Sequence, residues 1–248
     1  MTKNLFIKMI RDAGESVLAL LYPDICPFCG RRLKKEERGQ VCKRCQFGLP
    51  YIYEPKCKKC GKPLQDEHKE YCWDCEKRKH FYDRGVAVWE HRPVVAQAIY
   101  QFKYHNRRIY GRFFAREMVK SYESMIHQWN ISLIVPIPIS KKRKRQRGYN
   151  QAGILAKEIS RMTGIPCAQN LFIRVKDTMP QKKLGVKERR LNLMHAFAVK
   201  EGVKLPPNIL VIDDIYTTGN TMDMAACVLK KAGAENVFFM TISIGQGY

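Results

Sequence analysis

Two adjacent acids and a Thr-rich turn lie within thirteen residues of the chain. Residues 209–221 read ILVIDDIYTTGNT. The four leading apolar residues are typical of a strand buried on both faces, as in a parallel sheet covered by helices. Asp213 and Asp214 follow this strand, where they can accept hydrogen bonds from vicinal hydroxyls or hold a hydrated Mg²⁺. Residues 217–221 offer hydroxyls and N–H groups at a helix N-terminus, which favours a phosphate. The run therefore predicts a sugar-phosphate site.

The same run has a plainer explanation. Asp and Thr residues commonly end strands and cap helices. That use accounts for one Asp, but it does not account for adjacent acids directly before a Thr-Thr-Gly turn. We therefore favour the ligand site.

Eight of the ten cysteines form four C-x-x-C pairs between residues 26 and 75. Two residues between the sulfurs let a tight turn point both thiolates at one ion, and a second pair completes a tetrahedron. A disulfide framework does not suit a chain without export signals, and a redox C-x-x-C motif would occur once. We expect two structural zinc ions, paired sequentially, with an interleaved cross-brace as the alternative. The predicted ligands are Cys26, Cys29, Cys42 and Cys45 for one ion, and Cys57, Cys60, Cys72 and Cys75 for the other.

The chain is strongly basic, with a formal net charge of +22. Two sites of four thiolates and one Zn²⁺ would lower this to about +18. Residues 140–190 contain fifteen Lys or Arg and only three Asp or Glu. Such a concentration indicates a polyanionic partner, most simply nucleic acid, although a diphosphate site would use part of it. Lysines and aromatic residues also alternate around the cysteines, as in single-strand binders, but small zinc modules use the same residues for packing and solubility.

The first segment, residues 1–21, predicts an amphipathic helix, because its apolar residues fall on one helical face. Lys8, Arg11, Asp12 and Glu15 interrupt it, so we expect neither a signal peptide nor a membrane span. The helix is expected to pack on the rest of the protein, with attachment to a membrane surface as the alternative. These features favour a cytoplasmic protein, at most peripheral to the inner face of the membrane.

The elements that must position the acids follow from the later pattern. We expect strands at 83–90, 132–136 and 209–212, and helices at 93–104, 107–127 and 150–163. The basic run 141–151 follows a strand and leads through Gly148 into a helix, where cations and free N–H groups would meet. The basic stretch 174–192 has the length and Pro/Gly content of a mobile flap, although it could be an ordinary solvated loop.

Residues 209–221 closely resemble the 5-phosphoribosyl 1-diphosphate (PRPP) signature of type I phosphoribosyltransferases. That resemblance implies that Asp213 and Asp214 hold the ribose hydroxyls and that residues 217–221 bind the 5′-phosphate. It also places the motif near the third strand of a Rossmann-like sheet, in agreement with ligand binding at strand C-termini. The implied ligand-binding set is Asp213, Asp214, Thr217, Thr218, Gly219, Asn220, Thr221, Pro136 and Ile137, with Mg²⁺ accompanying PRPP.

A narrower resemblance covers nearly the whole chain. The four cysteine pairs, the segments FKY at 102–104, VPIP at 135–138 and RGYNQ at 147–151, and the pattern from Arg174 to Phe197 are similar to the ComF family of late competence proteins. This resemblance implies a role in natural transformation, acting on single-stranded DNA together with a helicase-like ATPase. If transfer occurs, we expect pyrophosphate to leave C1 through an oxocarbenium-like state. Mg²⁺ and the basic residues Lys103, Arg147, Arg189 or Arg190 would stabilise the leaving group by electrostatics.

Three hypotheses remain open. The first is a DNA-uptake protein that binds single-stranded DNA and carries a PRPP-binding domain. The second is a phosphoribosyltransferase acting on a nucleobase or amine, and the third is a non-catalytic adaptor. In each, we expect an α/β fold: a type I phosphoribosyltransferase-like parallel sheet flanked by helices at 81–248, preceded by a double zinc ribbon at 22–80 and the helix at 1–21.

Overall fold

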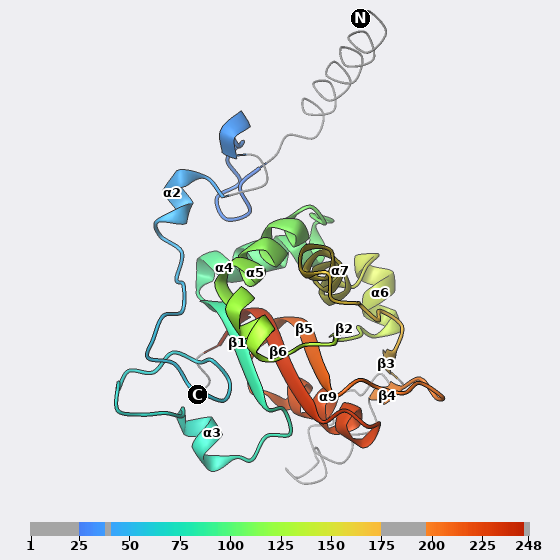
Figure 1. Cartoon of the computed structure of the whole chain (residues 1–248). Coiled ribbons are helices and arrows are strands. Elements are labelled where there is room, and N and C mark those ends of the chain that lie inside the picture. The colour runs from blue at the N-terminus through green and yellow to red at the C-terminus, as the bar shows by residue number, and fades with distance from the viewer. Residues whose placement is uncertain (1–24, 38–40, 175–196, 246–248) are drawn as a thin grey trace, which may run out of the picture. The chain divides into compact units, whose positions relative to one another are not determined.

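The computed structural model describes residues 25–37, 41–174 and 197–245 (Figure 1). The expected helix at 1–21 and the expected flap with Arg189 and Arg190 lie outside these residues. The chain divides into two compact units, residues 1–49 and 50–248. The cluster formed by Cys26, Cys29, Cys42 and Cys45, which we call the first ribbon, therefore belongs to a different unit from the cluster formed by Cys57, Cys60, Cys72 and Cys75, the second ribbon.

The first unit contains short elements around its cysteines. They are the 3₁₀ turn η1 (Lys35–Glu37) and helix α2 (Lys43–Gln46). Ile25 and Arg32 form an isolated β-bridge that closes the first cysteine turn.

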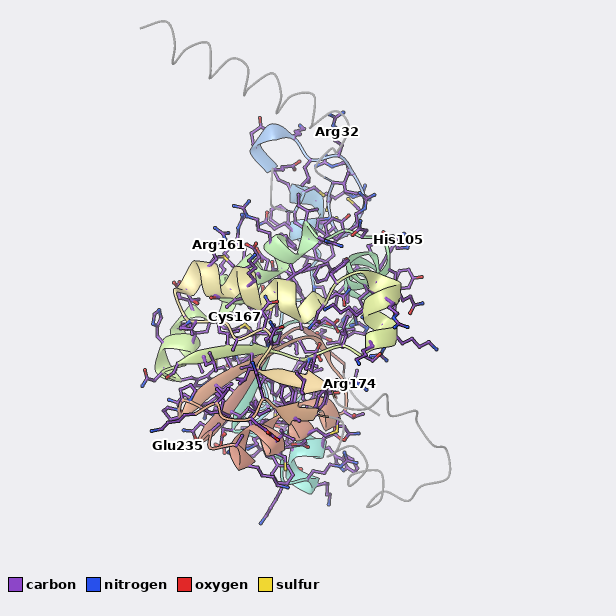
Figure 2. All side chains as sticks on the ribbon, turned by 90° about the vertical axis from the view of Figure 1, so that its right-hand side faces the viewer. Arg32, His105, Arg161, Cys167, Arg174 and Glu235 are labelled. Carbon is purple, nitrogen blue, oxygen red and sulfur yellow. The ribbon has the colours of Figure 1, made fainter. Side chains whose placement is uncertain are left out.

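The second unit is built on a parallel sheet with the strand order β1-β6-β5-β2 (Figure 1). Its strands are β1 (Arg84–Glu90), β2 (Leu133–Pro136), β5 (Asn208–Tyr216) and β6 (Asn236–Ile244). A small antiparallel pair is formed by β3 (Phe172–Arg174) and β4 (Phe197–Val199). Cys167, labelled in Figure 2, lies beside β2 through its bridge to Ile134. The predicted parallel sheet flanked by helices, after an N-terminal Cys₄ region, is confirmed.

Helices cover both faces of this sheet. The helices described in the second unit are α3 (Trp73–Lys77), α4 (Pro93–Tyr104), α5 (Tyr110–Gln128), α6 (Lys141–Arg147), α7 (Gln151–Thr163) and α9 (Asn220–Lys231). Helices α5 and α7 pack on one face, and α9 packs on the other. The core on the α9 side includes Cys57, Cys60 and Cys72, so the second ribbon is built into that layer.

Two glycines allow close packing where the second ribbon meets β1. A Cβ on Gly61 would lie 2.8 Å from the carbonyl oxygen of Gly85, and a Cβ on Gly85 would lie 2.0 Å from the Phe239 ring. The N–H of Gly85 donates to the carbonyl of Lys59 at 2.9 Å. A side chain on Gly61 would push the second ribbon away from β1, and a side chain on Gly85 would displace the Phe239 ring of the neighbouring strand β6.

The structure corrects two details of the predicted elements. Strand β5 continues through both acids to Tyr216, because it stays paired with β6 up to Ile244. The basic run forms helix α6, since the Ser140 hydroxyl caps it by accepting from the Arg143 N–H and Gly148 ends it with a positive φ. Among the described residues, the helices are all too short or too polar to cross a bilayer.

Candidate functional site

The predicted acids lie on β5 directly after Ile212, the last residue that pairs with β2. Asp214 is mostly buried, and its Oδ1 lies 2.7 Å from Lys103 Nζ at the end of α4. Asp213 is half-buried, and its Oδ1 accepts a hydrogen bond from the Asp214 N–H at 2.8 Å. Two predicted site residues of different segments, Lys103 and Asp214, are thus in direct contact.

The surroundings of Asp213 disfavour its ionised form. Burial and the neighbouring Asp214 carboxylate raise the pKa of Asp213 to about 7, against the opposing effects of the Asp214 N–H, Lys103 and Arg143. Asp213 is therefore partly protonated near neutral pH. A cation or hydroxyl donor placed between the acids would favour its ionised form.

The turn between β5 and α9, residues 217–219, has the geometry of an anion cradle. Gly219 is the N-cap of α9 with a φ of 79°, and it offers no side chain to cap the helix. Thr217, Thr218 and Asn220 are exposed, and Thr221 is half-buried. The first N–H groups of this twelve-residue helix are thus available to a phosphate.

Pro136 and Ile137 lie beside the same strand end. Pro136 is paired with Ile212, and the Ile137 N–H donates to the Ile212 carbonyl at 2.9 Å. Asn150 holds this segment by donating from Nδ2 to the Ile137 carbonyl at 2.9 Å, while its buried Oδ1 has no hydrogen-bond partner among the described residues. The predicted segment 136–137 therefore borders the acids.

The Arg147 side chain contacts the last residue of α4 and the first residue of α7. Its guanidinium lies 4.6 Å from the centre of the Tyr104 ring, and it donates to Tyr104 Oη at 2.7 Å and to Gln151 Oε1 at 3.1 Å. Arg147 thus links α6 to the residue after Lys103. Among the described contacts, none joins Arg147 to the acids.

Sequence reasoning missed His91 and the contribution of Arg143. His91 follows β1, and its Nδ1 lies 2.9 Å from Ser243 Oγ at the end of β6. Burial and Lys103 lower the pKa of His91, while Asp214 opposes this effect. The sequence could have indicated His91 through its position directly after a predicted strand, because the carboxyl ends of parallel strands meet at one edge of the sheet.

The predicted metal ligands form two groups with sequential pairing. In each group the four sulfurs lie within 4.8 Å of one another. Cys29 and Cys42 sulfurs are 3.7 Å apart, as are those of Cys60 and Cys72. Four sulfurs held tetrahedrally at about 2.3 Å from Zn²⁺ lie about 3.8 Å apart, so both groups fit zinc and leave no open ligand position.

Comparisons with known proteins agree with this arrangement. Residues 17–76 match the family of double zinc ribbon domains. Competence protein F of Haemophilus influenzae is 30% identical over 217 residues, covering 86% of this chain and 93% of that protein. Competence protein ComFC of Bacillus subtilis is 31% identical over 217 residues, covering 85% of each chain. DNA utilization protein YhgH of Salmonella typhimurium is 27% identical over 223 residues, covering 89% and 90%.

A solved structure of a purine phosphoribosyltransferase from Pyrococcus horikoshii is also similar, with a TM-score of 0.33 and 13% identity over 54% of this chain and 88% of that one. The likeness to competence protein F, by contrast, spans most of both chains. The chain belongs to the ComF family, together with competence protein F and ComFC.

Proposed function

We propose that this protein acts in DNA uptake during natural competence, binding PRPP with Mg²⁺ at the edge of its sheet and single-stranded DNA on an adjacent basic surface. The relatives named competence protein and DNA utilization protein support the general role. The observation that carries the PRPP site is the meeting of Asp213, Asp214 and Lys103 with an uncapped helix N-terminus.

Each part of PRPP has a matching group. The ribose hydroxyls would donate to Asp213 and Asp214, and the 5′-phosphate would accept from the N–H groups of the β5–α9 turn. Lys103 neutralises Asp214 when no ligand is bound. It would turn to the diphosphate once hydroxyls or Mg²⁺ satisfy that acid.

Calorimetric titration with PRPP and Mg²⁺ tests this site. Asp214→Asn should weaken PRPP binding at least about tenfold, because it removes a charge-assisted hydrogen bond. Lys157→Gln, on the exposed surface of α7, serves as a control and should bind as wild type. Equal affinity of wild type and Asp214→Asn would contradict the assignment.

The proposed DNA surface combines α6 with the end of α4. Six of the seven α6 residues are Lys or Arg, and all of these but Arg147 are exposed. Three cations at a helix N-terminus oppose the helix dipole, and like charges repel along one face, so this helix gains from a polyanion. Tyr100 and Tyr104 are 53% and 45% exposed, with ring centres 4.9 Å apart. His105 lies 5.6 Å from Tyr100 and extends this aromatic platform. Cations beside exposed rings match the backbone and bases of a single strand.

Fluorescence anisotropy with labelled oligo-dT tests the DNA surface. Tyr100→Ala should weaken binding about fivefold or more through lost stacking. Lys141→Gln/Lys142→Gln/Lys144→Gln should weaken it further and reduce the slope of log K against log salt by about 2, at roughly 0.7 for each phosphate that the variant no longer neutralises. Arg161→Gln on α7 is the charge control. A salt slope unchanged in the triple variant would place DNA elsewhere.

A second candidate, transfer of phosphoribose to a nucleobase or amine, is favoured by His91. A lowered pKa keeps this imidazole neutral and able to accept a proton near the acids. Pyrophosphate release from PRPP in the presence of candidate acceptors, lost in His91→Phe but not in Arg161→Gln, would support it. The helicase-like ATPase partner and the cytoplasmic location stay predictions.

A further inference from the structure

The β5–α9 turn rests directly on residues that follow the second ribbon. A Cβ on Gly219 would lie 2.5 Å from Tyr216 Oη and 3.4 Å from His80 Cε1. His80 is five residues beyond Cys75, so a segment distant in sequence forms the floor of the turn. The position of His80 therefore bears on the conformation of the turn.

His80 is joined to the first turn of α9 by Asp223. Its side chain is 1% exposed, and its Nδ1 lies 2.7 Å from Asp223 Oδ2. The Phe81 N–H donates to Asp223 Oδ1 at 2.9 Å, so both oxygens of this carboxylate are held by the same segment. The Asp223 N–H itself donates to the Gly219 carbonyl at 2.8 Å. Asp223 thus fixes the helix start and the turn to residues 80–81.

The other ring nitrogen of His80 is unsatisfied. Within the described part of the chain, Nε2 is buried and has no hydrogen-bond partner. Because the carboxylate must accept, Nδ1 carries a proton, and Nε2 is the ring nitrogen left without a partner among the described residues. Buried polar groups without a hydrogen bond are uncommon in native proteins, and such a group indicates strain, a functional role, or a bound water or ion.

Tyr82 connects this pair to the second ribbon. Its ring stacks on His80 at 4.7 Å, and its hydroxyl is 2.8 Å from Tyr216 Oη. Lys59, between Cys57 and Cys60, lies over the Tyr82 ring at 5.5 Å. The second ribbon, residues 80–82 and the turn therefore share one packed cluster.

We propose that His80 and Asp223 form a positioning pair that sets the β5–α9 turn for the 5′-phosphate of PRPP, and that the second ribbon supports this pair. The inference rests on the proposed PRPP site. It adds to that site His80, which is distant in sequence from residues 209–221, and Asp223, which lies just after them. His80 acts through the turn and does not touch the ribose. Removal of the pair should lower the affinity for PRPP without changing the affinity for single-stranded DNA.

The test compares His80→Leu with His80→Asn by calorimetry with PRPP and Mg²⁺. His80→Leu should weaken binding about tenfold, the loss expected when a buried hydrogen bond that orders the site is removed. His80→Asn keeps an N–H near the place of Nδ1 and should restore most of the affinity. Oligo-dT affinity should be unchanged in both.

Lys230→Met is the matched control, because Lys230 also ties α9 to this segment, at Asp83, but near the far end of the helix. It should lower the melting temperature slightly and leave PRPP affinity intact. Should His80→Leu fail to fold, Asp223→Asn gives the same comparison. Wild-type PRPP affinity in His80→Leu or Asp223→Asn, with binding lost in Asp214→Asn, would overturn the pair. Absence of PRPP binding by wild type would instead overturn the proposed function.

Discussion

The two ribbons share one local geometry and differ in their surroundings. In each, the glycine after the first cysteine pair has a positive φ, 71° at Gly30 and 75° at Gly61. In each, that glycine N–H donates at 2.9 Å to the first cysteine carbonyl, Cys26 or Cys57. The C-x-x-C-G sequence therefore sets the cysteine turn independently of context.

Their packing separates them. Cys29 of the first ribbon is exposed, and the ribbon belongs to the unit of residues 1–49. Cys57, Cys60 and Cys72 are buried in the same core as the sheet and α9. The comparison teaches that one metal motif can serve as a separate module and, thirty residues later, as part of a domain core. Four matched experiments test this difference.

The largest difference is expected from loss of a ligand. Cys72→Ser should destabilise the whole second unit, because a structural zinc contributes on the order of 10 kcal/mol to folding. The main melting temperature should fall by roughly 10 °C or more. Cys42→Ser should leave that transition in place. Calorimetry with zinc analysis checks both, and equal shifts would remove the distinction.

The paired glycines give the next effect. Gly30→Ala places its Cβ where nothing lies within 4 Å, so it should cost only the about 1–2 kcal/mol of the left-handed conformation. Gly61→Ala adds a collision with the Gly85 carbonyl and should cost a few kcal/mol more. Urea unfolding followed by far-ultraviolet circular dichroism measures the difference. Similar losses of stability in the two variants would mean that the second ribbon accommodates the added methyl group as easily as the first.

Removal of the ion pair beside each ribbon should give a smaller difference in stability. Lys62 is 5% exposed and contacts Asp74 at 2.7 Å. Lys62→Met should therefore lower the free energy of unfolding of the second unit by about 1–3 kcal/mol. Arg31, which pairs with Glu37 at 2.9 Å, is about half exposed, and Arg31→Met should not move the main transition. The reverse order would contradict the assignment of the two ribbons to different units.

Zinc release should show the smallest difference. With a chromogenic chelator in excess, the first ribbon should lose zinc about tenfold faster, because Cys29 is open to attack and the chain around the second must unfold locally. Two kinetic phases of equal amplitude are expected. Cys42→Ser should remove the fast phase, and a single phase in wild type would oppose this prediction.

Regular patterns in the sequence made most of the fold predictable. The apolar run 209–212 indicated a buried strand, and the segment 93–104 was predicted as the helix that the structure contains. The cysteine spacing gave both ligand groups, although only the structure settled their pairing. These features depend on residues close together in the chain.

Interactions between distant residues could not be predicted. His80 and Asp223 are 143 residues apart and lie on no shared pattern. Helix α6 lacks apolar periodicity, so its charges indicated an anion site but not a helix. The acids looked like the end of a strand, whereas pairing with β6 carries β5 past them. In each case a partner elsewhere in the chain decides the local structure.

The close approach of Gly61 to Gly85 has a consequence for recombination between relatives. Because Gly61 leaves room for the β1 backbone and Gly85 leaves room for the Phe239 ring of β6, residues 57–61 and 84–86 must be inherited together with Phe239. A chimera that exchanges the segment before Pro50 keeps all of these residues together and should fold with a foreign first ribbon. A chimera that exchanges residues 50–80 alone should succeed only from a donor with glycine at the equivalent of Gly61.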